Sequence, residues 1–76
     1  MKKENIVIED KIKDIIDAKD VALEYLVKEG IVVFTYEIVA IRKRRLAWLV
    51  EIDGKTFTGI VLIESKTSKV LTADRL

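Results

Sequence analysis

The chain has 76 residues and contains no cysteine, no histidine and no proline. Without cysteine, no disulfide can stabilise so small a domain, and without cysteine or histidine a structural zinc site lacks its usual ligands. The same absences remove the usual general base at neutral pH and the thiol nucleophile. We therefore expect a protein that is not an enzyme and that holds no metal and no other cofactor.

Long apolar runs are absent as well. The longest mostly apolar stretch, residues 31–41, is too short to span a bilayer and contains Glu37. The chain begins with mixed charge at residues 1–5, which does not resemble a secretory signal. We expect a cytoplasmic protein without membrane contact, or an exported one if the sequence is a trimmed form.

The sequence is nevertheless rich in hydrophobic residues, which make up 50% of the chain, while its net charge is only +1. A domain of this size buries about 60% of its unfolded surface, so its own core has a limited capacity. The excess of apolar residues predicts a second buried surface, most simply a homodimer interface. The near-zero net charge makes nucleic acid an unlikely partner.

The first half of the chain has helical spacing. We predict a helix from about Asp17 to Glu29 that ends at Gly30, with a further turn or two before it. Asp17 and Asp20 are spaced like a capping pair. Residues 1–16 are predicted to be an arm or helical lead, and residues 17–76 a single domain. The apolar positions on one helical face are Ile12, Ile15, Ile16, Ala22, Leu23 and Leu26.

After Gly30 the period changes to two, which is typical of strands. We expect strands over residues 31–41, 46–52, 55–64 and 69–72, with a type I′ turn at Asp53-Gly54. That turn would place Trp48 opposite Gly59. The predicted fold is α+β, with one main N-terminal helix packed on an antiparallel meander sheet of three to four strands.

The two faces of the predicted sheet are expected to be covered by different elements. The helix is expected to cover the face that carries Leu46, Trp48, Val50, Phe57, Val61 and Ile63. The opposite face is more apolar than a solvated sheet face should be. Either residues 1–16 or a second copy of the chain is expected to cover it. The candidate interface residues are Leu49, Ile60, Leu62, Val33 and Val39.

The order of these motifs resembles the PepSY family, a small module found in propeptides of some metallopeptidases and as free-standing proteins. The resemblance rests on a helix that opens at Asp17 and ends at Gly30, on residues 48–52 (Trp-Leu-Val-Glu-Ile), and on residues 59–71. It implies a PepSY/cystatin-like fold without catalytic residues, and a role in regulating or inhibiting a peptidase or in binding an extended peptide. Ser68 stands where the family usually has a turn glycine.

Two groups of charged residues offer alternatives. The basic run Arg42, Lys43, Arg44 and Arg45 is predicted to form the connection between the first two strands. Such a run could bind nucleic acid or an acidic partner, or it could be a solvated turn. Glu37 and Glu51, on neighbouring strands, would be the carboxylates of an enzyme, although solvated surface residues are the favoured interpretation.

Overall fold

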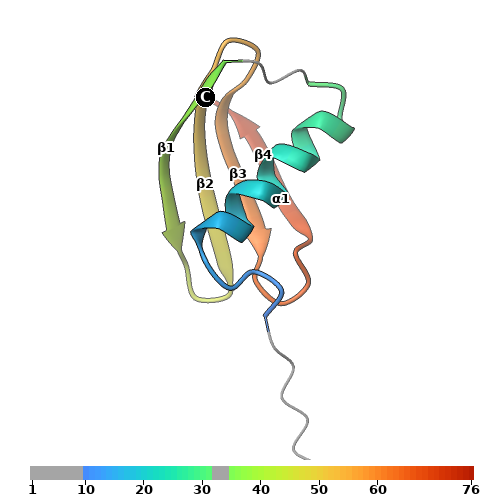
Figure 1. Ribbon diagram of the computed structural model, residues 1–76, viewed down its shortest axis with the longest axis vertical. Coiled ribbons are helices and arrows are strands. Elements are labelled where there is room, and N and C mark those ends of the chain that lie inside the picture. The colour runs from blue at the N-terminus through green and yellow to red at the C-terminus, as the bar shows by residue number, and fades with distance from the viewer. Residues whose placement is uncertain (1–9, 32–34) are drawn as a thin grey trace, which may run out of the picture.

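The computed structural model describes residues 10–31 and 35–76. Helix α1 (Ile15–Lys28) is followed by strands β1 (Tyr36–Lys43), β2 (Ala47–Gly54), β3 (Thr58–Glu64) and β4 (Val70–Arg75). The strands form one antiparallel sheet in the order β1-β2-β3-β4, and α1 crosses one of its faces (Figure 1). The structure confirms the predicted α+β class, with one N-terminal helix on a four-stranded meander.

Both ends of α1 are fixed by local hydrogen bonds. The Asp14 carboxylate accepts a hydrogen bond from the Asp17 N–H at 3.0 Å, so the cap lies three residues before the predicted Asp17–Asp20 pair, which was wrong. At the other end Gly30 has a φ of 82°, as expected of a helix stop. The Ile31 N–H donates to the Leu26 carbonyl at 2.9 Å, which completes a Schellman motif.

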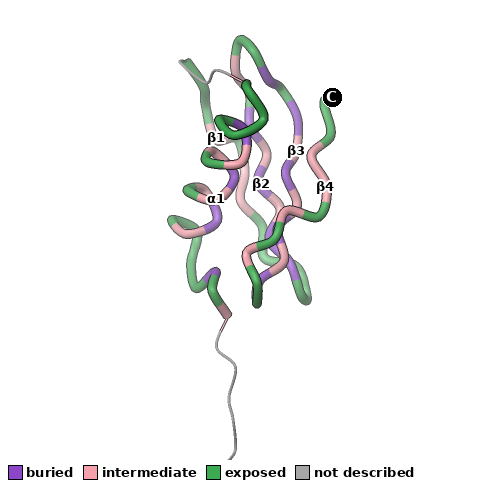
Figure 2. Tube along the Cα trace, turned by 90° about the vertical axis from the view of Figure 1, so that its right-hand side faces the viewer, coloured by how far each residue is buried: buried purple, intermediate pink, exposed green. Residues whose placement is uncertain are grey.

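The core lies between α1 and the facing side of the sheet. Ala18, Ala22 and Leu26 are fully buried on the helix, and Figure 2 shows this buried stripe turned toward β2 and β3. Ile15 and Ile16 were predicted on the same stripe but are 56% and 60% exposed. The end of the core is filled instead by Ile12, which precedes the helix and is 2% exposed.

The β2–β3 connection is longer than predicted. Asp53 pairs with Thr58, and the Gly54 N–H at the end of β2 donates to the Phe57 carbonyl at 2.9 Å, so residues 55–57 connect β2 to β3. Gly54 does not have the positive φ that a type I′ turn requires. Trp48 therefore pairs with Ile63 and not with Gly59. Because the shift is an even number of residues, the side chains of β2 and β3 keep their predicted faces.

The β1–β2 connection is shorter than predicted. β1 continues through Arg42 and Lys43, and the Arg44 N–H donates to the Ala47 carbonyl at 2.6 Å. The turn includes Leu46, which is 66% exposed, so its predicted place in the core was wrong. The other core residues predicted on the hairpin are buried. They are Trp48, Val50, Phe57, Val61 and Ile63.

In the β3–β4 turn, Ser68 occupies the position at which the PepSY family usually has glycine. Ser68 has a φ of 63°, a left-handed conformation that glycine adopts without strain. We expect Ser68→Gly to raise the free energy of unfolding by about 0.5 kcal/mol, since the relief of strain exceeds the added flexibility of the unfolded chain. Lys66→Gly, in the same turn but without a positive φ, should lower it by a similar amount. Urea denaturation measures both, and stabilisation by Lys66→Gly would contradict this explanation.

Candidate interaction surface

The face of the sheet opposite α1 carries two rows of paired residues. In the first row Leu49 and Leu62 lie side by side, between Arg42 and Thr72 on the edge strands. In the second, Glu51 and Ile60 lie between Ala40 and Asp74. Three of the predicted interface residues, Leu49, Ile60 and Leu62, are thus brought together at the centre of this face. We refer to it as the open face.

The three central residues are half-buried by their neighbours within the sheet, but they do not belong to the core cluster under α1. An antiparallel sheet face in contact with water normally carries polar side chains at its centre. Here three of the four central positions are apolar and the fourth is Glu51, while Arg42, Thr72 and Asp74 lie on the edge strands. A mainly apolar centre with a polar rim is the arrangement found at many protein interfaces.

Each edge strand contains a β-bulge that adds an apolar residue. The β1–β2 register shifts at Val39, which is 53% exposed, and the β3–β4 register shifts at Leu71, which is 49% exposed. Neither side chain packs against the core. Val39 was predicted as an interface residue and is exposed; Leu71 was missed, because a bulge leaves no clear sign in a sequence. Val33 lies outside the described residues.

The alternative cover for the open face was the segment of residues 1–16. Its described part lies elsewhere, because the Lys11 and Ile12 N–H groups donate to the carbonyls of Lys66 and Ser65 at 3.4 and 3.0 Å. Ile12 is buried with Trp48 in the core on the α1 side. Residues 1–9 are outside the described part of the chain. Among residues 10–31 and 35–76, nothing packs over Leu49, Ile60 and Leu62 as α1 does over the core.

Charges on the open face are divided between its two ends. Glu37 pairs with Asp53 at one end, and Glu51 and Asp74 lie one row further in, so four carboxylates share this region. Glu51 is opposite Ile60, whereas the predicted register placed it opposite Thr56. Within residues 10–31 and 35–76 no group of acidic side chains is arranged to hold a metal ion. The other end carries Arg42, the turn that follows it, and Glu64, which pairs with Ala47.

The predicted basic run does not form one patch. Arg42 lies in the row of Leu49, on the open face. The Lys43 ammonium lies 5.8 Å from the centre of the Trp48 ring and donates to the Arg44 carbonyl at 3.0 Å. It therefore closes the turn and covers the tryptophan on the other face. Arg44 and Arg45 are exposed at the turn itself.

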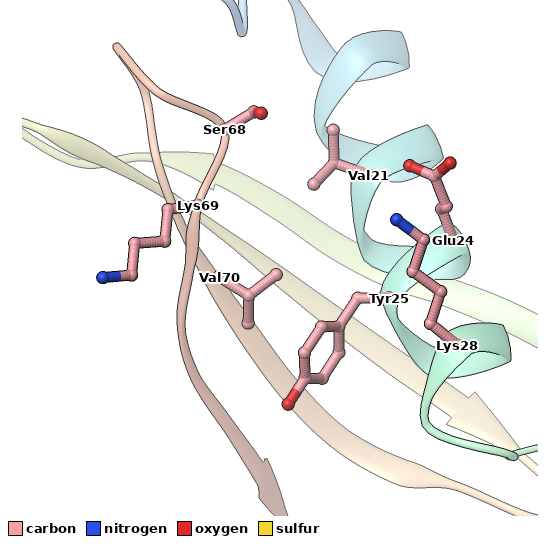
Figure 3. A pocket seen from close by; sticks show the side chains of 7 residues that line it. All are labelled: Val21, Glu24, Tyr25, Lys28, Ser68, Lys69 and Val70. Atoms are coloured by element: carbon pink, nitrogen blue, oxygen red, sulfur yellow. The ribbon is translucent and has the colours of Figure 1, made fainter.

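A groove that was not predicted from the sequence lies between α1 and the beginning of β4 (Figure 3). It has a volume of about 360 Å³, and Val21, Tyr25 and Val70 form its apolar part. The helical spacing places Val21 and Tyr25 on one side of α1, but only the position of β4 makes a groove of them.

None of the helices within the described residues is long and apolar enough to cross a membrane.

No family model, curated protein or solved structure matches this chain. The resemblance to the PepSY family therefore rests on the motifs described above.

Proposed function

We propose that the protein is a non-enzymatic association module that pairs with a second copy of itself through the open face. The observation that supports this proposal is the apolar centre formed by Leu49, Ile60 and Leu62, over which no described residue packs. Burial of such residues is favourable by roughly 25 cal/mol for each Å² removed from water. Flanking residues Val39 and Leu71 would extend the buried area toward both edges.

The distribution of charge favours one arrangement of the two copies. If a two-fold axis lies perpendicular to the strands, the end of one copy that carries Arg42 faces the partner's end that carries Glu37 and Asp53. If the axis runs parallel to the strands, the acidic ends face each other, and like charges repel. We propose the first arrangement, in which both copies contribute the same surface.

The decisive test is the solution mass of the wild type and of a variant with Leu49→Lys and Leu62→Lys, measured by light scattering over a concentration series. We expect a dimer for the wild type and a folded monomer for the variant, because two buried, unpaired ammonium groups oppose association. Both side chains lie on the open face outside the core cluster, so the variant should fold. Circular dichroism checks that it does.

The matched control adds the same two charges to α1, at Ile16→Lys and Val27→Lys. Both side chains are exposed large hydrophobics, 60% and 64% accessible, and offer the competing apolar surface. The control should remain a dimer. A wild type that is monomeric at every concentration would contradict the proposal, and so would a dimer that only the control variant dissociates.

The resemblance to the PepSY family adds a class of partner. We propose that the association module regulates or inhibits a peptidase, as that resemblance implies. The basic turn at Arg44 and Arg45 is exposed and would be available to acidic groups of such a partner.

A further inference from the structure

We propose that the outer edge of β4, which pairs with no strand among the described residues, accepts an extended peptide segment as a fifth strand, which lies beneath the C-terminal half of α1. This edge is separate from the open face, and the proposal does not depend on self-association. Strand addition takes its affinity from backbone hydrogen bonds and its specificity from the alternate side chains of the added strand. Both components can be identified at β4.

The first observation is that α1 covers the sheet unevenly. It packs on β1, β2 and β3, and its C-terminal end lies beyond β4 in Figure 1. The space between that part of the helix and the start of β4 is the 360 Å³ groove shown in Figure 3. Val21 and Tyr25 face it from the helix and Val70 from the strand, and all three are half-buried. The groove thus lies on the side of β4 where a fifth strand would place every second side chain.

The second observation concerns the backbone of β4. The Leu76 N–H donates to the Thr58 carbonyl at 2.8 Å, which fixes the phase of hydrogen bonding along the β3–β4 ladder. In an antiparallel pair, residues that bond to the neighbour alternate with residues whose N–H and C=O point away from it. By this alternation, Thr72 and Asp74 bond to β3, while Ala73 and Arg75 present their backbone groups to the open edge. These are the groups that a fifth strand would bind.

The opposite edge of the sheet is less suitable. β1 is the other edge strand, but its bulge at Val39 lies in the middle of the strand and interrupts the regular spacing of backbone groups. The exposed charges of Arg42 and Lys43 at its end also protect that edge. In β4 the bulge lies near the beginning, and residues 72–75 are regular. The geometry therefore points to β4 instead of β1.

The occupant is an extended segment of another protein and not a second copy of β4. A two-fold pairing of two β4 edges would bring both α1 helices to the same side of one continuous sheet. Because the C-terminal end of each helix already lies beyond its own β4, the two helices would compete for the same space (Figure 1). A lone strand has no such obstacle.

Charges next to the edge define the chemistry of the segment. Lys28 on α1 and Lys69 before β4 line the groove, with Glu24 as the one acidic side chain there. Asp74 is exposed on the other face of β4. A matching antiparallel segment carries apolar residues opposite Ala73 and its neighbours on the α1 side, a basic residue opposite Asp74, and an acidic residue on the α1 side that reaches Lys28, since the Lys69 side chain points away from α1 (Figure 3). The peptide Val-Lys-Val-Thr-Val-Thr-Glu has this pattern when its first residue lies opposite Arg75.

The test is a nitrogen-15 NMR titration of the full chain with this peptide, acetylated and amidated at its ends. We expect saturable shifts at Ala73 and Arg75, and slower exchange of their amide hydrogens with solvent, because free edge amides become hydrogen-bonded. A control peptide has proline in place of its second valine, the residue opposite Ala73. This change removes one backbone donor, and the peptide should bind at least about tenfold more weakly. Absence of binding, or shifts confined to β1, would overturn the proposal.

Two variants of the protein test the contributions of the β4 edge and of the groove separately. Ala73→Pro removes an N–H that faces the open edge, a position at which proline is tolerated in sheets. Val21→Lys places a charge in the groove from the half-buried side of α1. Each should weaken binding about tenfold or more, and retention of full affinity by a folded Val21→Lys variant would contradict the role of the groove. The Leu49→Lys, Leu62→Lys variant should bind the peptide as the wild type does, so failure of self-association and failure of peptide binding are distinguishable.

Discussion

Gly59→Ala is expected to lower the free energy of unfolding by about 3 kcal/mol, the upper part of the range for overpacked positions. A methyl group at Gly59 would overlap the backbone carbonyl oxygen of Asp74 and lie 2.9 Å from the Arg75 Cα. Both obstacles belong to the backbone of β4, so the strand itself would have to move. β4 has β3 as its only neighbour in the described sheet and receives little cover from α1, so it should separate first.

Urea denaturation measures the loss, and hydrogen exchange shows whether the β4 amides lose protection before those of β2. The control is Gly30→Ala, where the added carbon has no atom within 4 Å but the φ of 82° remains unfavourable. We expect Gly30→Ala to lower the free energy of unfolding by about 1 kcal/mol. If the two substitutions were equally destabilising, close approach of β4 would not be the reason for glycine at position 59.

Gly59 was predicted on the correct face of the sheet, but from a pairing with Trp48 that the structure does not have. The two-residue turn predicted at Asp53-Gly54 placed Gly59 opposite Trp48, which would explain the glycine by aromatic cover. In the structure Gly59 pairs with Ile52 and with Arg75, whose guanidinium lies 5.3 Å from the centre of the Phe57 ring. Alternation along a strand depends only on period two, so the buried face was predictable, whereas the length of the loop was not.

The open face was predictable for the same reason, but its limits were not. Leu49, Ile60 and Leu62 share one face in any register with the correct parity. The two bulges shift the edge strands and bring Val39 and Leu71 to exposed positions, and no local pattern announces them. Likewise, the apolar side of α1 is visible in the sequence, but the uncovered β4 edge follows from the path of the helix across the sheet. The period of the sequence therefore predicted which residues share a surface, whereas the extent and shape of each surface became known only from the structure.

Leu26→Ala is the second substitution with a large expected effect. Leu26 is the largest fully buried side chain of α1 and is 0% exposed in the core. Its truncation should lower the free energy of unfolding by about 3 kcal/mol through lost burial and the cavity left behind. The loss cannot come from the helix itself, because alanine favours helix more than leucine does, and the Leu26 carbonyl that accepts the Ile31 N–H belongs to the backbone.

Leu23→Ala is the matched control, since Leu23 lies on the same helix and is only half-buried against the core. It should lower the free energy of unfolding by about 1 kcal/mol, in proportion to the smaller apolar area that it removes from water. Trp48, buried on the facing strand, reports both urea transitions by fluorescence. Equal losses for the two variants would mean that α1 is not held by the stripe of Ala18, Ala22 and Leu26. In that case the position of the helix above the β4 edge, on which the peptide-binding proposal depends, would also be wrong.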